Sequence, residues 1–426
     1  MNQMITMNKF FVRWIGVAVL LVCLCPGIAG AIETQVDVEK EIDSLSALEM
    51  AERALIDTLY YHFDPWFPRF ERRIKQLEAR PQTIANQLEL MRFYFYMAGL
   101  HGELTHVLAF TSKYKIQKIK KDFLYYSDKA KELAETLLEN PKLSKENYAD
   151  AYFYLGVSEG YMALLEYGEG NLFSALMDGL NADNHLDDAL ELDPGHADAH
   201  VGLGIYRYGN TRLGGLGNFI MQGGSDLRLV GLRHIETALE KEILSKPLAL
   251  KNLIWFYISE QINPENASLP DNDPLSNYVA RSRAMYLLDK YEKLYFVNAP
   301  EGFVGNKGLA MMKAIQFVLN GDYVQALKEF EKNLRICDHL LRVKKFKLNP
   351  QYVSTIKAAA EFCKLMIAAG ANTSASNPKS CVKVAEKIDF IEDGGSMVDY
   401  ESSKLRGEIQ SVFHDRLKGL SSRLGC

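Results

Sequence analysis

Apolar residues recur at spacings of three and four positions along almost the whole chain. Between Leu45 and Leu55, for example, Leu48, Ala51 and Leu55 would share one face of a helix. An alternation of period two, which would indicate strands, is nearly absent. The pattern therefore predicts an all-α protein. Further helices are expected over residues 83–111, 116–139, 147–167, 173–192, 228–245, 275–296, 307–319, 322–341, 351–369 and 400–423.

Turn-forming residues separate these helices. Asn140-Pro141, Asp193-Pro194-Gly195 and Asn349-Pro350 each combine a residue that favours turns with a proline that cannot continue a helix. The aromatic run from Tyr60 to Pro68 is expected to form a packed elbow. The segment from Ala371 to Lys379 is rich in Ser, Asn and Thr and is expected to be a flexible connection.

The middle of the chain contains an internal repeat. The pair Leu203-Gly204 follows Leu155-Gly156 by 48 residues, and the pair Ala238-Leu239 follows Ala189-Leu190 by 49. Two independent landmarks thus give nearly the same period. Repetition at a fixed period of this length is typical of proteins built from stacked helix pairs.

These residues resemble the tetratricopeptide repeat, whose period is about 34 residues. Gly321-Asp322-Tyr323 matches the turn between the two helices of a repeat, and Ala326 and Phe330 match its second helix. The second-helix half of an earlier unit also matches, at Ala182, Leu186, Ala189, Leu190, Leu192 and Pro194.

The resemblance implies an α-solenoid of stacked antiparallel helix pairs, with central repeats longer than the family period. In that family the first helices line a concave face that binds peptides or extended partners. The helix-packing positions that the resemblance assigns are Leu155, Gly156, Ala189, Leu203, Gly204, Ala238, Gly321, Tyr323, Ala326 and Phe330.

The first 31 residues have the pattern of a secretory signal peptide. Lys9 and Arg13 precede an apolar run from Trp14 to Cys25, and Ala29-Gly30-Ala31 has the spacing of a cleavage site. We expect cleavage after Ala31 and export, with the bacterial periplasm as the destination. Retention of this segment as an anchor is the alternative. The remaining sequence contains no apolar run long enough to cross a bilayer.

Composition excludes some classes of protein. With 48% hydrophobic residues the chain has enough apolar material for a packed core, so a disordered protein is not expected. Its 49 basic residues are balanced by 54 acidic residues, so no positive field indicates binding to nucleic acid.

The mature chain is expected to contain an N-terminal helical region (32–115), a repeat array (116–345) and a C-terminal helical cap (346–426). All four cysteines of the mature chain lie near or within this cap. An oxidising compartment allows disulfides among them, and buried free thiols are the alternative. The four are Cys337, Cys363, Cys381 and Cys426.

No motif indicates an enzyme, a metal or a cofactor. His196, Asp198 and His200 have spacing compatible with metal ligation, but they follow a repeat boundary, and a structural role is expected. Gly202-Leu203-Gly204 and the glycines from Gly214 to Gly217 lack the remaining residues of a dinucleotide or phosphate-binding loop. We therefore expect a non-catalytic protein.

The segment from Tyr206 to Gly224 is the strongest candidate for a binding surface. Aromatic side chains and arginines alternate in it before a glycine-rich insertion, and these residue types anchor interfaces. A structural elbow is the alternative for this segment. The candidate partner-binding residues are Tyr152, Tyr206, Tyr208, Asn210, Arg212 and Arg228.

The function expected from these features is an exported scaffold that binds a protein or peptide partner in the cell envelope. The first alternative is a solute-binding accessory subunit, because Gly223-Gly224-Ser225 and the helix Leu232–Leu239 resemble the helical accessory component of periplasmic TRAP transport systems. An open groove would favour the scaffold, whereas an enclosed interior would favour the solute-binding subunit. A hydrolase with acidic residues carried on the repeats is a further alternative.

Overall fold

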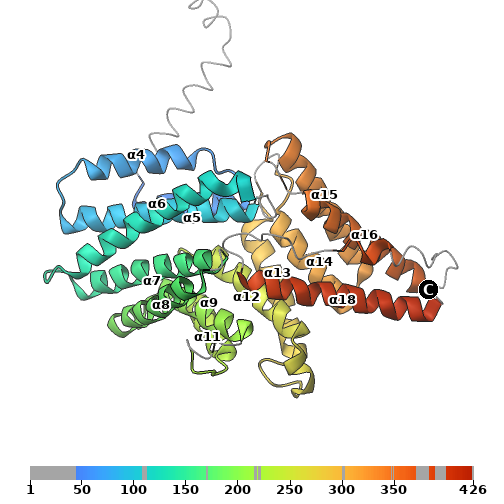
Figure 1. Cartoon of the computed structure of the whole chain (residues 1–426). Helices are drawn as coiled ribbons and strands as arrows, with labels where there is room; N and C mark the ends of the chain where they lie inside the picture. Colours follow the sequence, from blue (N-terminus) through green and yellow to red (C-terminus); the bar gives the residue numbers. More distant parts are fainter. Residues whose placement is uncertain are drawn as a thin grey trace, which may run out of the picture. The chain divides into compact units, whose positions relative to one another are not determined.

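Helices account for all the regular secondary structure in the described part of the chain. The structure is a computed structural model, and it describes residues 45–107, 113–168, 171–214, 218, 222–299, 303–346, 348, 350–370, 383–388 and 400–424. These residues contain fourteen α-helices, one short 3-10 helix and no strand, which confirms the all-α prediction (Figure 1). The helices are α3 (Ala47–Leu59), α4 (Trp66–Glu78), α5 (Ile84–Val107), α6 (Lys113–Leu138), α7 (Lys145–Gly168), α8 (Leu172–Leu192), α9 (Ala197–Leu213), α11 (Arg228–Ala238), α12 (Lys246–Ile262), η1 (Pro264–Ser268), α13 (Asn277–Tyr295), α14 (Lys307–Asn320), α15 (Tyr323–Arg342), α16 (Pro350–Gly370) and α18 (Tyr400–Leu424).

The chain divides into two units, Met1–Ala51 and Glu52–Cys426. The expected signal peptide lies outside the described residues. Among the described residues, no helix combines the length and the apolar character needed to cross a membrane. The helices from α4 to α18 all belong to the larger unit.

Consecutive helices of the larger unit pack against each other in pairs, most extensively α7 with α8, α5 with α6, and α9 with α11. Two glycines permit the close approach of these helices. A Cβ atom on Gly156 in α7 would lie 3.0 Å from Leu186 Cγ in α8. A Cβ atom on Gly204 in α9 would lie 2.6 Å from Ile235 Cγ1 in α11. The Leu-Gly pairs of the repeat therefore lie at equivalent helix crossings.

The turn between α14 and α15 has the geometry that its glycine permits. Gly321 ends α14 with a φ angle of +77°, a left-handed conformation that favours glycine. The side chain of Asp322 then caps α15 by accepting a hydrogen bond from the backbone N–H of Gln325 at 3.1 Å. The ring of Tyr323 packs edge-on against Phe362 of α16.

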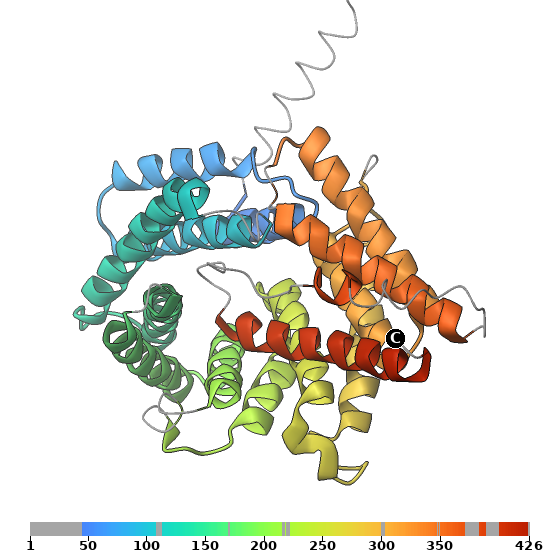
Figure 2. The same ribbon diagram turned by 45° about the vertical axis from the view of Figure 1, so that its right-hand side comes forward.

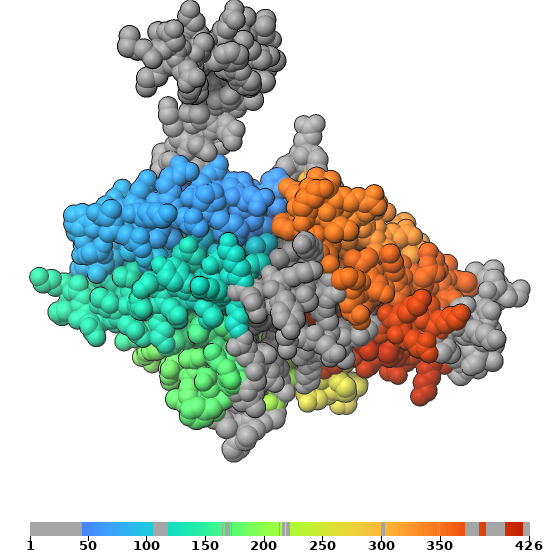
Figure 3. Space-filling view, turned by 45° about the horizontal axis from the view of Figure 1, so that its top comes forward, coloured from blue at the N-terminus to red at the C-terminus, as the bar shows by residue number. Residues whose placement is uncertain are grey.

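Segments far apart in the sequence meet in this unit. The backbone N–H of Lys307 donates to the Tyr61 hydroxyl at 2.5 Å, and Asn306 Nδ2 donates to the carbonyl of Leu59 at 2.8 Å. Phe63 packs with residues of α15, so the N-terminal helices adjoin α15 on the surface drawn in Figure 3. Lys251 in α12 also lies 3.3 Å from the carboxylate of Glu103 in α5.

The C-terminal helix α18 packs across several earlier helices of the unit. It contacts α7, α9, α12 and α16 (Figure 2). Its C-terminal half is held by Phe413, whose ring contacts Phe330 and Phe362. Arg416 donates to the Tyr323 hydroxyl at 3.0 Å. Phe330 and Ala326 are both fully buried in the core.

The cysteines that the structure describes are free thiols. Cys337 and Cys363 are both buried and unpaired, and burial raises the pKa of Cys337 to about 11 and that of Cys363 to about 12. These two residues therefore do not form the disulfide that was one of the two alternatives for them. Cys381 and Cys426 lie outside the described residues.

Candidate functional site

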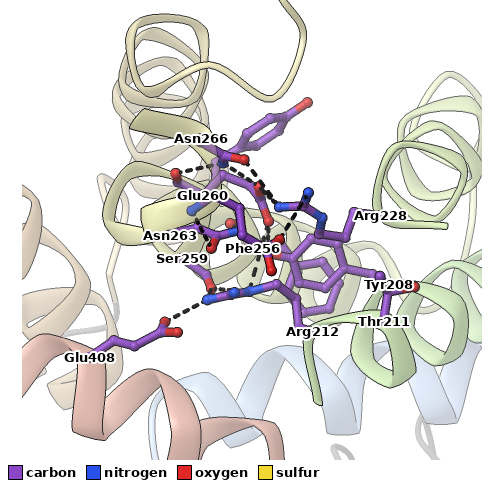
Figure 4. A network of polar contacts seen from close by, with 12 residues as sticks. Tyr208, Thr211, Arg212, Arg228, Phe256, Ser259, Glu260, Asn263, Asn266 and Glu408 are labelled. Carbon is purple, nitrogen blue, oxygen red and sulfur yellow. Dashed lines mark hydrogen bonds and ion pairs between the residues drawn. The ribbon is translucent and has the colours of Figure 1, made fainter. Parts of the chain in front are cut away.

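A network of buried charged side chains joins α9, α11, α12, η1 and α18 (Figure 4). Its centre is Glu260 in α12, whose side chain is fully buried. The carboxylate of Glu260 accepts hydrogen bonds from Arg228 Nη1 at 2.9 Å, from the Tyr208 hydroxyl at 2.8 Å and from Asn266 Nδ2 at 2.6 Å. Three donors from three helical elements thus stabilise one buried negative charge.

Arg212 in α9 is the second arginine of the network. Its Nε and Nη2 atoms donate to Ser259 Oγ at 2.9 and 2.7 Å. Nη2 also donates to Glu408 Oε2 of α18 at 2.5 Å, whereas Nε lies 3.9 Å from Glu260. The Arg212 side chain is 8% exposed and that of Glu408 18% exposed. The guanidinium is therefore held between the core of the network and α18.

Arg228 connects the network to solvent on the opposite side. It pairs with Asp226 at 2.8 Å and with Glu265 at 3.4 Å, and both of these carboxylates are exposed. Burial alone would lower the pKa of Arg228, but its hydrogen bonds with Asp226 and the negative charges of Glu260 and Glu265 outweigh burial and raise it. Arg228 therefore stays charged, as a buried arginine paired with several carboxylates should.

The network also fixes one aromatic contact. The ring of Tyr208 stacks on Phe256 with centroids 3.9 Å apart, and its hydroxyl reaches Glu260. Burial raises the pKa of Tyr208 well above its usual range, and the charge of Glu260 adds to that effect. The hydroxyl thus remains a hydrogen-bond donor. Because each buried charge needs its partners, the arrangement favours a single relative placement of α9, α11, α12 and α18.

The structure separates the six residues expected to bind a partner into three places. Tyr208, Arg212 and Arg228 belong to the buried network, where each has an intramolecular partner. Tyr206 and Asn210 lie on another face of α9, and both are partly buried. Tyr152 stacks on His185 in the pair α7–α8. The six residues therefore do not form one surface.

The residues that supply the acceptors of the network were not predicted from the sequence. Glu260, Ser259, Asn266 and Glu408 were not singled out, although they supply its acceptors. Glu260 follows Arg228 by 32 residues and Glu408 follows Arg212 by 196. One signal was present: a glutamate within the continuous apolar run of α12 needs a buried cation.

The repeat period also appears in polar contacts. In the pair α7–α8, His185 Nδ1 lies 2.6 Å from the buried carboxylate of Glu159. In the pair α9–α11, His234 Nε2 lies 3.3 Å from Arg207 Nη1. The histidines are 49 residues apart and their partners 48. The two helix pairs therefore place a histidine against a charged partner at equivalent positions. The partner is a carboxylate in α7–α8 and a guanidinium in α9–α11.

The histidines after the repeat boundary have structural contacts. His196 caps α9, since its Nδ1 accepts from the backbone N–H of Ala199 at 3.1 Å. Asp198 accepts from the backbone N–H of Ser245, where α12 begins, at 3.1 Å. Within the described residues no group of three or more His, Cys, Asp or Glu side chains is placed to hold a metal ion.

No family model, no curated protein and no solved structure matches this chain. The resemblance to tetratricopeptide repeats therefore remains an expectation carried by the repeat residues from Leu155 to Phe330.

Proposed function

We propose that the protein is an exported, non-catalytic binding protein whose helix pairs form a tetratricopeptide-like α-solenoid. In this proposal it holds a small solute between its helices and serves as an accessory subunit of envelope transport. The observation that carries this proposal is the position of α18, which packs against α7, α9 and α12. These are the first helices of successive pairs, the helices that line the concave face in the tetratricopeptide family.

A peptide in such a concave face would compete with α18 for the same helices. A small molecule can be held between helices without removing α18, because binding sites of this kind are enclosed and mostly apolar. The hydrogen bonds of Tyr61 and Asn306 and the ion pair between Glu103 and Lys251 also bring the N-terminal helical region against α12 and the start of α14. Both features favour an enclosed interior over an open groove.

Aromatic side chains on the first helices could contact such a solute. Phe95 of α5 and Tyr161 of α7 are only partly buried, and their ring centroids are 6.2 Å apart. Phe95 also contacts Phe153 and Tyr154 of α7. Aromatic rings of this kind supply much of the apolar contact area in ligand sites.

The scaffold function remains the second candidate because α13 exposes aromatic side chains. Tyr278 is 66% exposed and Tyr286 57%, and Met285 on the same helix is exposed as well. Exposed aromatic residues grouped on one helix are typical of contacts with proteins. These residues lie on α13, outside the buried network.

Native mass spectrometry of the chain from residue 32 to 426, purified without denaturation, tests the proposal. We expect a species heavier than the chain, whose extra mass disappears after extraction with organic solvent. Phe95→Ala should lower the fraction that retains this mass, because it removes apolar contact area. Tyr286→Ala, the matched control on α13, should leave the fraction unchanged.

The scaffold function makes the opposite prediction. In that case native mass spectrometry should find only the mass of the chain itself, and an envelope protein should crosslink to the chain in cells. The crosslink should be lost in Tyr286→Ala and retained in Phe95→Ala. That pair of results would refute the solute-binding proposal.

A further inference from the structure

Arg212 is bound on two sides by groups of different character. Ser259 and Glu260 belong to α12, which is buried along most of its length. Glu408 belongs to α18 and reaches Arg212 from a helix that begins only eight residues earlier. In Figure 4 Glu408 approaches from the side away from Glu260. Arg212 therefore forms two hydrogen bonds with α12, through Ser259, and one with α18, through Glu408.

The two halves of α18 are anchored differently. Ile409, Phe413 and Leu417 are buried, and Arg416 is bonded to α14 and α15. By contrast, residues 405–408 are only partly buried. The first two turns of a helix can open locally while the rest stays packed, because opening free energies vary along a structure. Glu408 lies at the boundary between the two halves.

We propose that Arg212 is a carboxylate-binding residue of the protein interior, and that Glu408 occupies its site as an exchangeable internal carboxylate. This inference rests on the proposed function, since it assigns a carboxylate group to the bound solute. The solute carboxylate displaces Glu408 and takes its hydrogen bond from Arg212 Nη2, while the first turns of α18 open.

The contacts of Arg212 suit this exchange. Ser259 accepts from both Nε and Nη2, which fixes the plane of the guanidinium without neutralising its charge. Arginine presents a rigid planar fork that matches a carboxylate. If Glu408 leaves, Arg212 loses its 2.5 Å hydrogen bond and keeps the more distant carboxylate of Glu260, 3.9 Å from Nε, so a second carboxylate restores the closer pairing. A carboxylate ligand supplies the negative charge for this pairing and a neutral ligand does not.

Isothermal titration with phenylacetate and with its neutral analogue phenylacetamide tests the inference. Three chains of residues 32–426 are compared: the unaltered protein, Glu408→Gln, and the double variant Arg212→Gln, Glu408→Gln. We expect Glu408→Gln to bind the acid about tenfold more tightly than the amide, consistent with a charge-assisted hydrogen bond. The preference should be smaller in the unaltered protein, where Glu408 competes, and absent in the double variant.

Hydrogen exchange in the unaltered protein provides a second readout that needs no variant to fold. Phenylacetate should accelerate exchange in the peptide covering residues 400–408 and leave residues 409–420 unchanged, whereas phenylacetamide should do neither. Equal affinity of Glu408→Gln for acid and amide, or a preference that survives in the double variant, would overturn the inference. If native mass spectrometry still finds a retained molecule, the proposed function stands and only the carboxylate assignment fails.

Discussion

At the scale of single residues, the pair of imidazoles between α9 and α11 has one arrangement of protons that satisfies all its contacts. His200 Nδ1 and His234 Nδ1 lie 2.8 Å apart, so one proton lies between them. Arg207 faces His234 Nε2 at 3.3 Å and can only donate, which leaves the proton of His234 on Nδ1. His200 then accepts at Nδ1 and donates from Nε2 to the carbonyl of Pro194 at 3.2 Å.

This arrangement makes the α9–α11 contact sensitive to acid. Burial lowers the pKa of His234 from 6.5 to about 4, and the charge of Arg207 and then that of His200 contribute to the same shift. The unfolded chain takes up a proton near pH 6.5, whereas the folded chain resists it until about pH 4. The contribution to stability is therefore complete above pH 6.5 and is lost as the pH falls towards 4.

Urea unfolding of the unaltered protein and of His234→Gln between pH 7.5 and 4 measures this effect. The free energy of unfolding of the unaltered protein should fall more steeply towards pH 4 than that of the variant, by roughly 1–3 kcal/mol. His101, whose pKa burial also lowers to about 4, is present in both proteins and cancels in the comparison. Parallel pH profiles would contradict the lowered pKa of His234.

The residues of the buried network show how far single positions could be interpreted from sequence. Tyr208, Arg212 and Arg228 were selected because aromatic and arginine side chains anchor interfaces, and their interface is internal. Their acceptors, Glu260 and Glu408, come from helices whose placement depends on packing over the whole unit. Spacing along the chain carries no information on that packing.

At the scale of helices, the crossing of α9 and α11 depends on a glycine in each. A Cβ atom on Gly204 would lie 2.7 Å from the carbonyl oxygen of Gly231, and one on Gly231 would lie 2.6 Å from that of Gly204. Backbone atoms cannot move away as a flexible side chain can. The two helices would therefore have to separate.

Gly204→Ala should lower the free energy of unfolding by about 1–3 kcal/mol through overpacking, as measured by urea unfolding. Gly99→Ala in α5 is the matched control, since its Cβ atom would meet no described neighbour within 4 Å. Removing a glycine from a helix interior there should stabilise by about 0.5–1 kcal/mol. If both variants changed the free energy of unfolding in the same direction, helix propensity and not the close crossing would determine the effect of Gly204→Ala.

Most helix ranges were predicted closely, but α4 and α12 were not among them. The ranges expected for α13 and α14 agree with the structure to within two residues. The helix α12 was not expected, because it is buried from Ala249 to Glu260 on more than one side and its apolar residues have no single-face period. The helix expected over 228–245 ends at Ala238. The backbone N–H of Lys241 donates to the carbonyl of Ala238, which forms a turn in place of further helix.

At the scale of the whole larger unit, α18 connects helices that are distant in the sequence. It contacts α7, α9 and α12 in the first part of the chain and α16 in the second. Ile409, Phe413 and Leu417 are buried in its interface. Burial of side chains of this size contributes about 1.5–3 kcal/mol each, so loss of α18 would remove several kcal/mol of apolar stabilisation.

A chain ending at residue 399 should therefore lose stability in both groups of helices that α18 contacts. We expect faster hydrogen exchange in α7, α9 and α12 as well as in α16, because Arg212 loses Glu408 and Phe362 loses Phe413. Phe413→Ala separates the apolar contribution from the ionic one. It keeps Glu408, should cost about 3–5 kcal/mol, and should accelerate exchange mainly in α15 and α16. A truncated chain whose exchange changes only in α16 would show that α18 does not couple the two groups of helices. It would also contradict the placement of α18 across the concave face.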